Sequence, residues 1–232
     1  MSTPPDRATT ARAEILRRVE AARPQTAPPV TRDYDGADGP AGSDLIDLLV
    51  DRLEDYRATV RRCTAADLPA ALASFLAGAP TVVIPPGVPA SWLSPHGDNA
   101  AHEGGSSDDG GAVRGPVAVR DGDPVLLTVT ELDAPGVAVV TGCAVAVAET
   151  GTLILDAGPD QGRRLLTLVP DHHICVVRAD QIVARLPAAL RRLEDPTRPL
   201  TMISGPSATS DIELNRVEGV HGPRRLNVVI VD

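Results

Sequence analysis

Residues 136–178 read GVAVVTGCAVAVAETGTLILDAGPDQGRRLLTLVPDHHICVVR, and this stretch decides the fold. Short runs rich in Val, Leu and Ile are separated by Gly, Pro and Asp, as in strands joined by turns. We expect strands at VAVV, AVAVAE, TLILD, LLTLV and HICVV, and further along the chain at LTMIS and LNVVIV. Several of these runs are apolar at consecutive positions, which is typical of strands covered on both faces.

Helices are expected between these strands. One is predicted at residues 180–193, restarted by Pro187, and another at residues 207–216. Upstream, helices are predicted from Ser43 and over residues 64–77, with strands at 81–84 and 117–119. The alternation predicts an α/β fold: a Rossmann-like open, mostly parallel sheet with helices on both faces. Because VAVAE and TLILD flank Thr150 and Gly151, they could also form a tight hairpin, so we expect the sheet to be mixed.

The chain is expected to have two parts. Residues 1–42 form a helical N-terminal extension and linker, with an amphipathic helix over residues 8–22 that ends before Pro24. Residues 43–232 form a single α/β domain that carries a mobile, acidic, Gly/Ser-rich excursion at about 94–123. The extension would pack on a partner or on a second copy of the chain, so a homo-oligomer is possible.

Composition excludes several classes of function. The 232-residue chain contains no lysine, which excludes a Walker A phosphate loop, a pyridoxal Schiff base and a Ser-x-x-Lys nucleophile. Its net charge of −9 and its few aromatic residues argue against a nucleic-acid partner. The longest apolar run, residues 137–148, is too short to span a membrane. The three cysteines form no Cys-x-x-Cys pair, so we predict no metal, no iron–sulfur cluster bound by this chain, and a cytoplasmic location.

Three segments could carry chemistry. The strand AVAVA runs into Glu149, Thr150 and Gly151, which brings a carboxylate to a strand end. Thr150 and Gly151 are predicted to bind the ligand there. The strand TMIS runs into a loop of small residues whose hydroxyls and N–H groups suit a small carboxylate or phosphate. The ligand-binding residues predicted in that loop are Ser204, Gly205, Ser207, Ser210 and Glu213, with Asp211 as a proton-transfer candidate. Each segment also has a plain structural interpretation, as a strand-end charge or as a helix cap.

The third segment precedes the last strand. His221 stands between glycines on a loop, so it is a proton-transfer candidate beside Glu149, and Gly222 and Arg224 would help to bind the anion. A Gly-Pro turn with ordinary surface charges would give the same pattern. His172 and His173 are neighbours at the start of a predicted strand. Their side chains should point to opposite faces, so a shared metal is not expected.

The same segments resemble a known family. AETGT, SGPSATSDIE and GVHGP, within residues 136–232, are similar to the LUD-domain proteins, specifically the lactate-utilisation protein C branch. The resemblance implies a fold like the ribose-phosphate isomerase and CoA-transferase (NagB/RpiA/CoA transferase-like) group. It also implies a non-redox role in a cytoplasmic complex that oxidises L-lactate to pyruvate with iron–sulfur partner proteins.

An alternative rests on a second analogy. CoA-transferases of this fold carry a catalytic glutamate followed by a small polar residue and glycine, and Glu149-Thr150-Gly151 is similar. The chain could therefore be a stand-alone enzyme, acyl-transferase-like or sugar-phosphate-isomerase-like, that uses Glu149 as nucleophile or base. We favour the lactate-utilisation complex, in which this chain binds a small anion.

Overall fold

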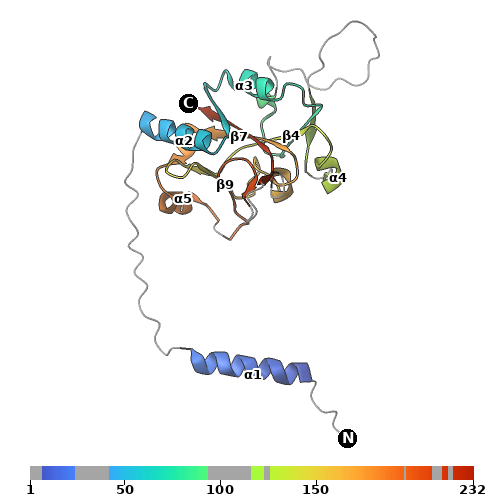
Figure 1. Ribbon diagram of the computed structural model, residues 1–232, viewed down its shortest axis with the longest axis vertical. Helices are drawn as coiled ribbons and strands as arrows, with labels where there is room; N and C mark the ends of the chain where they lie inside the picture. The colour runs from blue at the N-terminus through green and yellow to red at the C-terminus, as the bar shows by residue number, and fades with distance from the viewer. Residues whose placement is uncertain are drawn as a thin grey trace. The chain divides into compact units, whose positions relative to one another are not determined.

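The structure is a computed structural model that describes residues 7–23, 42–93, 116–122, 126–195, 197–210, 216–218 and 222–232 (Figure 1). Its contacts divide the chain into residues 1–35 and residues 36–232. The first unit contains α1 (Arg7–Ala22), close to the helix predicted at 8–22. Ile15 and Val19 on this helix are 61% and 60% exposed, so its apolar stripe is uncovered by the described residues of its own unit.

The second unit is built on a six-stranded sheet with all neighbours parallel. The strand order is β1 (Thr59–Cys63), β12 (Arg225–Val231), β7 (His172–Arg178), β4 (Val137–Thr141), β2 (Thr81–Ile84) and β3 (Val117–Arg120). Every residue of the central strand β7 except Arg178 is buried, which explains its consecutive apolar positions. The predicted α/β class with a mostly parallel sheet is confirmed.

Different layers cover the two faces of this sheet. On one face lie α3 (Leu68–Phe75) and the short helix η1 (Ala90–Trp92), packed on Val140, Ile174 and Val229. On the opposite face, α2 (Ser43–Asp55) and a second, four-stranded sheet pack on Cys175, Val177 and Val228. The helix α4 (Val129–Leu132), capped by Thr128 and Glu131, buries Leu132 beside β2 and β4.

The small sheet has the order β8 (Ile182–Val183), β5 (Val145–Val147), β6 (Thr152–Leu155) and β9 (Thr201–Ile203). β5 and β6 form the hairpin expected across Thr150 and Gly151, and β8 pairs in parallel with β5, so the mixed character is confirmed within this second sheet. Its outer face is covered by α5 (Leu186–Arg192), which buries Ala189 against Val145 and Val147. Gly151 has φ +59°, and a Cβ there would lie 2.9 Å from the Cβ of Arg52, so the turn fits onto α2 only as glycine.

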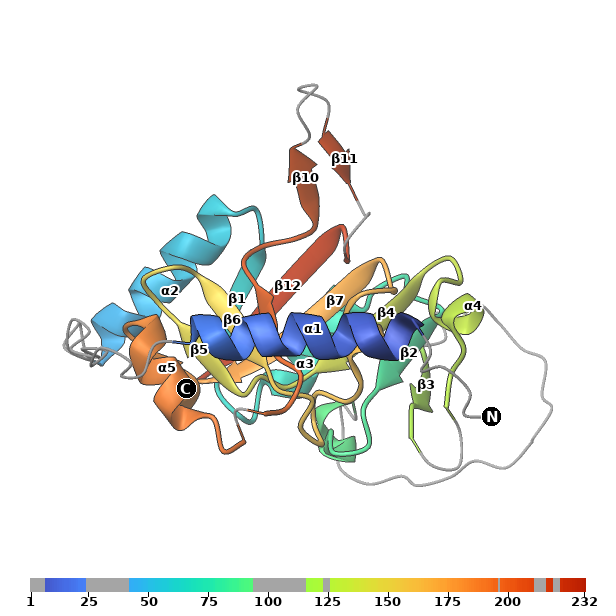
Figure 2. The same cartoon turned by 90° about the horizontal axis from the view of Figure 1, so that it is seen from below.

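Several predicted elements were wrong. The run LLTLV is not a strand but the short helix η2 (Arg164–Thr167), because Arg163 beside it is tied to Asp121 by two hydrogen bonds and Leu166 is drawn into the core. The predicted helix at 207–216 is absent from its described part. β10 (Ala208–Ser210) pairs antiparallel with β11 (Arg216–Glu218) instead, and Figure 2 shows this hairpin projecting from the domain. Ser-Ala-Thr-Ser has no apolar face to hold a helix on the core.

Two further differences concern boundaries. The predicted helix at 180–193 begins only at Leu186, after the short helix η3 (Ala179–Gln181) and β8. Strand β1 was not predicted, because Thr-Val-Arg-Arg-Cys is polar and lies at a sheet edge.

Candidate functional site

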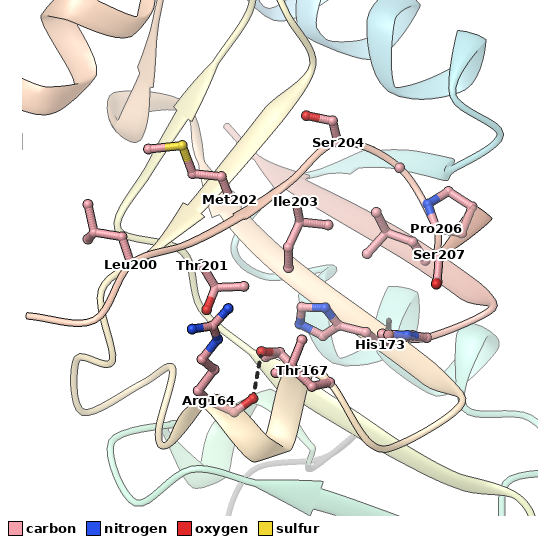
Figure 3. A pocket seen from close by; sticks show the side chains of 15 residues that line it. Arg164, Thr167, His173, Leu200, Thr201, Met202, Ile203, Ser204, Pro206 and Ser207 are labelled. Carbon is pink, nitrogen blue, oxygen red and sulfur yellow. Dashed lines mark hydrogen bonds between the residues drawn. The ribbon is translucent and has the colours of Figure 1, made fainter. Parts of the chain in front are cut away.

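A cavity of about 300 Å³ lies where the small sheet covers the large one. Its walls come from η2, from the start of β7, from β9 with the loop after it, and from Gly222, Pro223 and Leu226 (Figure 3). It brings together four predicted ligand-binding residues: Ser204, Gly205, Ser207 and Gly222. The cavity is at the carboxyl end of β9, as predicted, but at the amino ends of β7 and β12.

The loop at 204–207 is held in place by backbone contacts. Gly205 has φ +82°, and a Cβ there would lie 2.6 Å from the Cβ and 2.8 Å from the carbonyl oxygen of Tyr56, which caps α2. The N–H of Ser207 donates to the carbonyl oxygen of Pro223 at 2.8 Å. The Ser204 hydroxyl lies 2.8 Å from the Thr152 hydroxyl, and Figure 3 shows it pointing away from the cavity. Ser204 therefore lines the cavity with its backbone atoms rather than with its hydroxyl.

The other predicted residues lie elsewhere. Glu149 is 54% exposed, pairs with Arg185 at 3.5 Å and does not line the cavity. Thr150 and Gly151 are also outside it, although the hydroxyls of Thr150, Thr152 and Ser204 form a chain that reaches its rim. Arg224 pairs with Asp171 at 3.3 Å and lines a separate cavity. Asp211, Glu213 and His221 fall outside the described residues, and Ser210 belongs to β10.

Two further cavities lie elsewhere in the second unit. One, of about 440 Å³ on the α3 face, is lined by Arg57, Arg224 and Arg225. The other, of about 290 Å³ at the carboxyl ends of β4 and β7, includes Asp160, whose pKa is raised by burial. Neither contains a buried polar atom without a partner among the described residues, whereas the first cavity does.

Three residues that were not predicted supply the chemistry of the first cavity: Arg164, Thr167 and His173. The Arg164 guanidinium lies beside Thr201 in Figure 3 and forms no ion pair with a described residue. No acidic residue occurs among the described residues that line the cavity. Its charge is therefore positive and unpaired, which suits an anion.

His173 is fully buried and lines the cavity close to Ile203 (Figure 3). Its Nε2 lies 2.8 Å from the Thr141 hydroxyl oxygen, whereas its Nδ1 has no hydrogen-bond partner among the described residues. Burial, and to a smaller extent the neighbouring His172, lower the pKa of His173 to about 3. The imidazole is therefore neutral at physiological pH and acts through hydrogen bonds rather than charge.

His172 faces the other side of the sheet, as predicted. Its Nε2 lies 2.6 Å from the Asn227 side-chain oxygen, and its Nδ1 lies 3.1 Å from the Arg225 guanidinium. Both ring nitrogens are paired, so His172 is a satisfied structural histidine. The position of His173 in the strand could have indicated its environment. Side chains alternate along a strand, so His173 lies on the opposite face from His172, beside the buried Leu226.

Among the described residues, no helix has the length and apolar content needed to cross a membrane. The same part of the chain holds no group of three or more His, Cys, Asp or Glu side chains that could bind a metal ion.

Comparison with known proteins supports the resemblance found in the sequence. A family model of the LUD domain matches residues 137–231. "Lactate utilization protein C" of Deinococcus radiodurans is 44% identical over 220 residues, which cover 94% of this chain and 92% of that protein. "Lactate utilization protein C 1" of Bacillus mycoides is 35% identical over 100 residues, or 40% of this chain and 42% of the relative. The crystal structure of a DUF162 family protein from D. radiodurans matches with a TM-score of 0.65 and 41% identity, covering 83% of this chain and 100% of that one.

Proposed function

Because the chain belongs to the LUD-domain family, we propose that it acts in lactate utilisation, in a cytoplasmic assembly that oxidises L-lactate to pyruvate. The oxidation releases two electrons, which need a carrier. An iron–sulfur cluster requires about four ligands, usually thiolates, whereas this chain has three cysteines that are distant in sequence. In the proposed division of labour, iron–sulfur partner proteins carry the electrons and this chain binds a small carboxylate.

One observation carries the proposal: the cavity of about 300 Å³ is lined by Arg164, which forms no ion pair with a described residue, and by no acidic residue that the structure describes. Its size lies at the lower end of the range of small-molecule sites, about 300–1,000 Å³. A planar guanidinium can hold a carboxylate through two parallel hydrogen bonds.

Binding of L-lactate to the purified chain, followed by isothermal titration calorimetry, tests the site. Arg164→Ala should weaken binding about tenfold to a hundredfold, the effect of losing a hydrogen bond to a charged group. Arg191→Ala is the matched control, since Arg191 is an exposed arginine on α5 that does not line the cavity. Equal affinity in wild type and Arg164→Ala, or no binding at all, would contradict the proposed site.

The assembly is tested separately. Co-expression with candidate iron–sulfur subunits of a lactate-utilisation system should give a complex that co-elutes in size-exclusion chromatography. Deletion of the gene should abolish growth on lactate as sole carbon source, and the wild-type gene should restore it. Normal growth together with failure to co-elute would refute the role in lactate oxidation.

The Glu149 alternative receives less support from the geometry. A nucleophile or base must touch the reacting atoms, whereas Glu149 lies on an exposed turn and pairs with Arg185. Glu149→Gln should therefore leave L-lactate binding unchanged. A loss of binding in this variant would restore the alternative.

A further inference from the structure

A second group of arginines lies on the other face of the large sheet. Arg57, Arg224 and Arg225 line the cavity of about 440 Å³ on the α3 face, at the amino ends of β1, β12 and β7. None of the described residues that line this cavity is acidic. Among the described residues it shares only Leu226 with the cavity proposed to bind a carboxylate, so the two cavities are separate sites.

The register of three neighbouring strands brings polar side chains together in this cavity. Arg225 of β12 lies in register with His172 of β7, and Asn227 of β12 lies in register with Thr59 of β1. Side chains two residues apart on a strand share a face, so Arg225 and Asn227 lie on the same side of the sheet as Val229, which packs beneath α3. The last residues of α3 border the cavity, so the polar side chains lie where this helix ends.

The buried His172 holds the guanidinium of Arg225 in place without neutralising it. A guanidinium only donates hydrogen bonds, so Arg225 Nη2, 3.1 Å from His172 Nδ1, donates to that nitrogen. The proton of the imidazole then lies on Nε2, which donates to the Asn227 side-chain oxygen at 2.6 Å. Burial lowers the pKa of His172, which keeps the ring neutral at physiological pH. A carboxylate partner would cancel the charge of Arg225, whereas a neutral imidazole leaves that charge available to a ligand.

The positive charge of this cavity is only partly balanced by its surroundings. Arg57 and Arg225 form no ion pair with a described residue. Arg224 pairs with Asp171, but both side chains are more than half exposed, and ion pairs in such positions are weak. The carboxyl end of α3 adds about half of a negative charge. Asp171 and this helix end together offset about half of the charge of the three arginines.

We infer that this cavity binds a phosphate monoester, whose phosphate group meets the guanidinium groups of Arg57, Arg224 and Arg225. A phosphate monoester carries a charge of about −1.5 to −2 at pH 7 and three acceptor oxygens, so it can pair with several arginines at once, whereas a carboxylate has one charge and two oxygens. The Thr59 hydroxyl also lines the cavity and supplies a further donor. Phe75, Ala77 and Leu226 add apolar surface for the organic part of the ester.

Isothermal titration of the full chain with glycerol 3-phosphate, at physiological ionic strength, tests this site. Arg57→Gln and Arg225→Gln should each weaken binding about tenfold to a hundredfold, the effect of losing a hydrogen bond to a charged group. Arg191→Gln is the matched control, since Arg191 is an exposed arginine on α5 outside the cavity. Inorganic phosphate should bind more weakly than the ester, because it lacks the organic part. No binding of glycerol 3-phosphate, or equal affinity in the wild type and both cavity variants, would overturn the inference.

The same titrations distinguish this site from the carboxylate cavity. Arg164→Ala should leave the affinity for glycerol 3-phosphate unchanged, because Arg164 lines the other cavity. Loss of ester binding in Arg164→Ala, with binding kept in Arg225→Gln, would place the ester in the other cavity and overturn the second site. Failure of L-lactate to bind concerns the proposed function alone, since no residue that holds the phosphate group lines that cavity.

His172 is a positioning residue in this site, and two measurements test that role. His172→Gln keeps an acceptor for Arg225 and should bind glycerol 3-phosphate nearly as tightly as the wild type, whereas His172→Leu should weaken binding about tenfold. Circular dichroism checks that both variants fold. Nitrogen-15 NMR of the wild-type chain should show the His172 proton on Nε2 before any ligand is added. A proton on Nδ1, or equal affinity in the two variants, would overturn the positioning of Arg225 by His172.

Discussion

The contact between Gly205 and Tyr56 predicts a measurable loss of stability for Gly205→Ala. The residue has φ +82°, in the left-handed region that costs an alanine about 1–2 kcal/mol. The added Cβ would also lie 2.6 Å from the Tyr56 Cβ and 2.8 Å from its carbonyl oxygen, and such overpacking costs about 1–3 kcal/mol. The free energy of unfolding should therefore fall by about 2–5 kcal/mol.

Gly78→Ala is the matched control for this substitution. Gly78 has φ +84°, but a Cβ there would meet no atom within 4 Å, so only the backbone cost of about 1–2 kcal/mol applies. Urea unfolding followed by circular dichroism measures both variants. Gly205→Ala should also weaken L-lactate binding, since the loop at 204–207 lines the cavity, whereas Gly78→Ala should not. Equal loss of stability in the two variants would show that the loop does not rest on α2.

Two further predictions concern charge. Asp121 is buried, which raises its pKa, but hydrogen bonds from Arg163 and the N–H of Leu127 outweigh burial and lower the pKa. Its folded pKa is below the unfolded one, so its stabilisation exists above about pH 4 and is lost as pH falls. Asp121→Asn should lower the free energy of unfolding by about 2–3 kcal/mol at pH 7. This loss is somewhat smaller than for a fully buried ion pair because Arg163 is partly exposed. The control Asp133→Asn, at an exposed position, should change the free energy of unfolding little. A cost as small as that of Asp133→Asn would refute the buried pair. The pKa of His173 is also lowered, from 6.5 to about 3. As pH falls, the unfolded chain therefore binds a proton at this histidine before the folded chain does. Stability should drop by about 1.4 kcal/mol per pH unit below 6.5 from this residue alone, and His173→Gln should remove that slope from urea unfolding at pH 7, 6 and 5. Identical slopes in wild type and variant would contradict a neutral buried His173.

The sequence predicts the strands of the large sheet well because their signal is local. β2 occupies the predicted residues 81–84, and β4, β7 and β12 lie within a residue or two of theirs. Each is a run of β-branched residues closed by Gly, Pro or charge, so the pattern needs no tertiary information. The hairpin β5–β6 was foreseen for the same reason, from Thr150-Gly151 between two apolar runs.

The second sheet could not be predicted in the same way. Whether β5 and β6 join the large sheet or cover it depends on long-range pairing with β8 and β9, which the local pattern does not encode. η2 was missed because an apolar run of five residues is as compatible with a short helix as with a strand. That error concealed Arg164 and Thr167, which reach the cavity only because η2 turns there.

The sequence therefore predicts the loop at 204–207 that lines the cavity but does not predict Arg164, Thr167 and His173. Clusters of Gly, Pro and Ser indicate loops, and this composition predicts the loop at 204–207. His173 gives no such signal, because a histidine beside a buried strand is usually a satisfied core residue. Only the structure shows that its neighbour His172 has partners for both ring nitrogens, whereas among the described residues His173 has a partner for Nε2 alone.

The two adjacent histidines of β7 have different hydrogen-bonding environments on the two faces of the sheet. β7 alternates its side chains, so His172 meets Arg225 and Asn227 on the α3 face while His173 meets the cavity beneath the small sheet. Both have a lowered pKa and burial is the main cause for each, so burial alone does not distinguish them. The difference is the unpaired Nδ1. Nδ1 is itself buried, so its lack of a partner among the described residues is a cost of about 1–3 kcal/mol to the folded state, whereas His172 has both of its ring nitrogens paired.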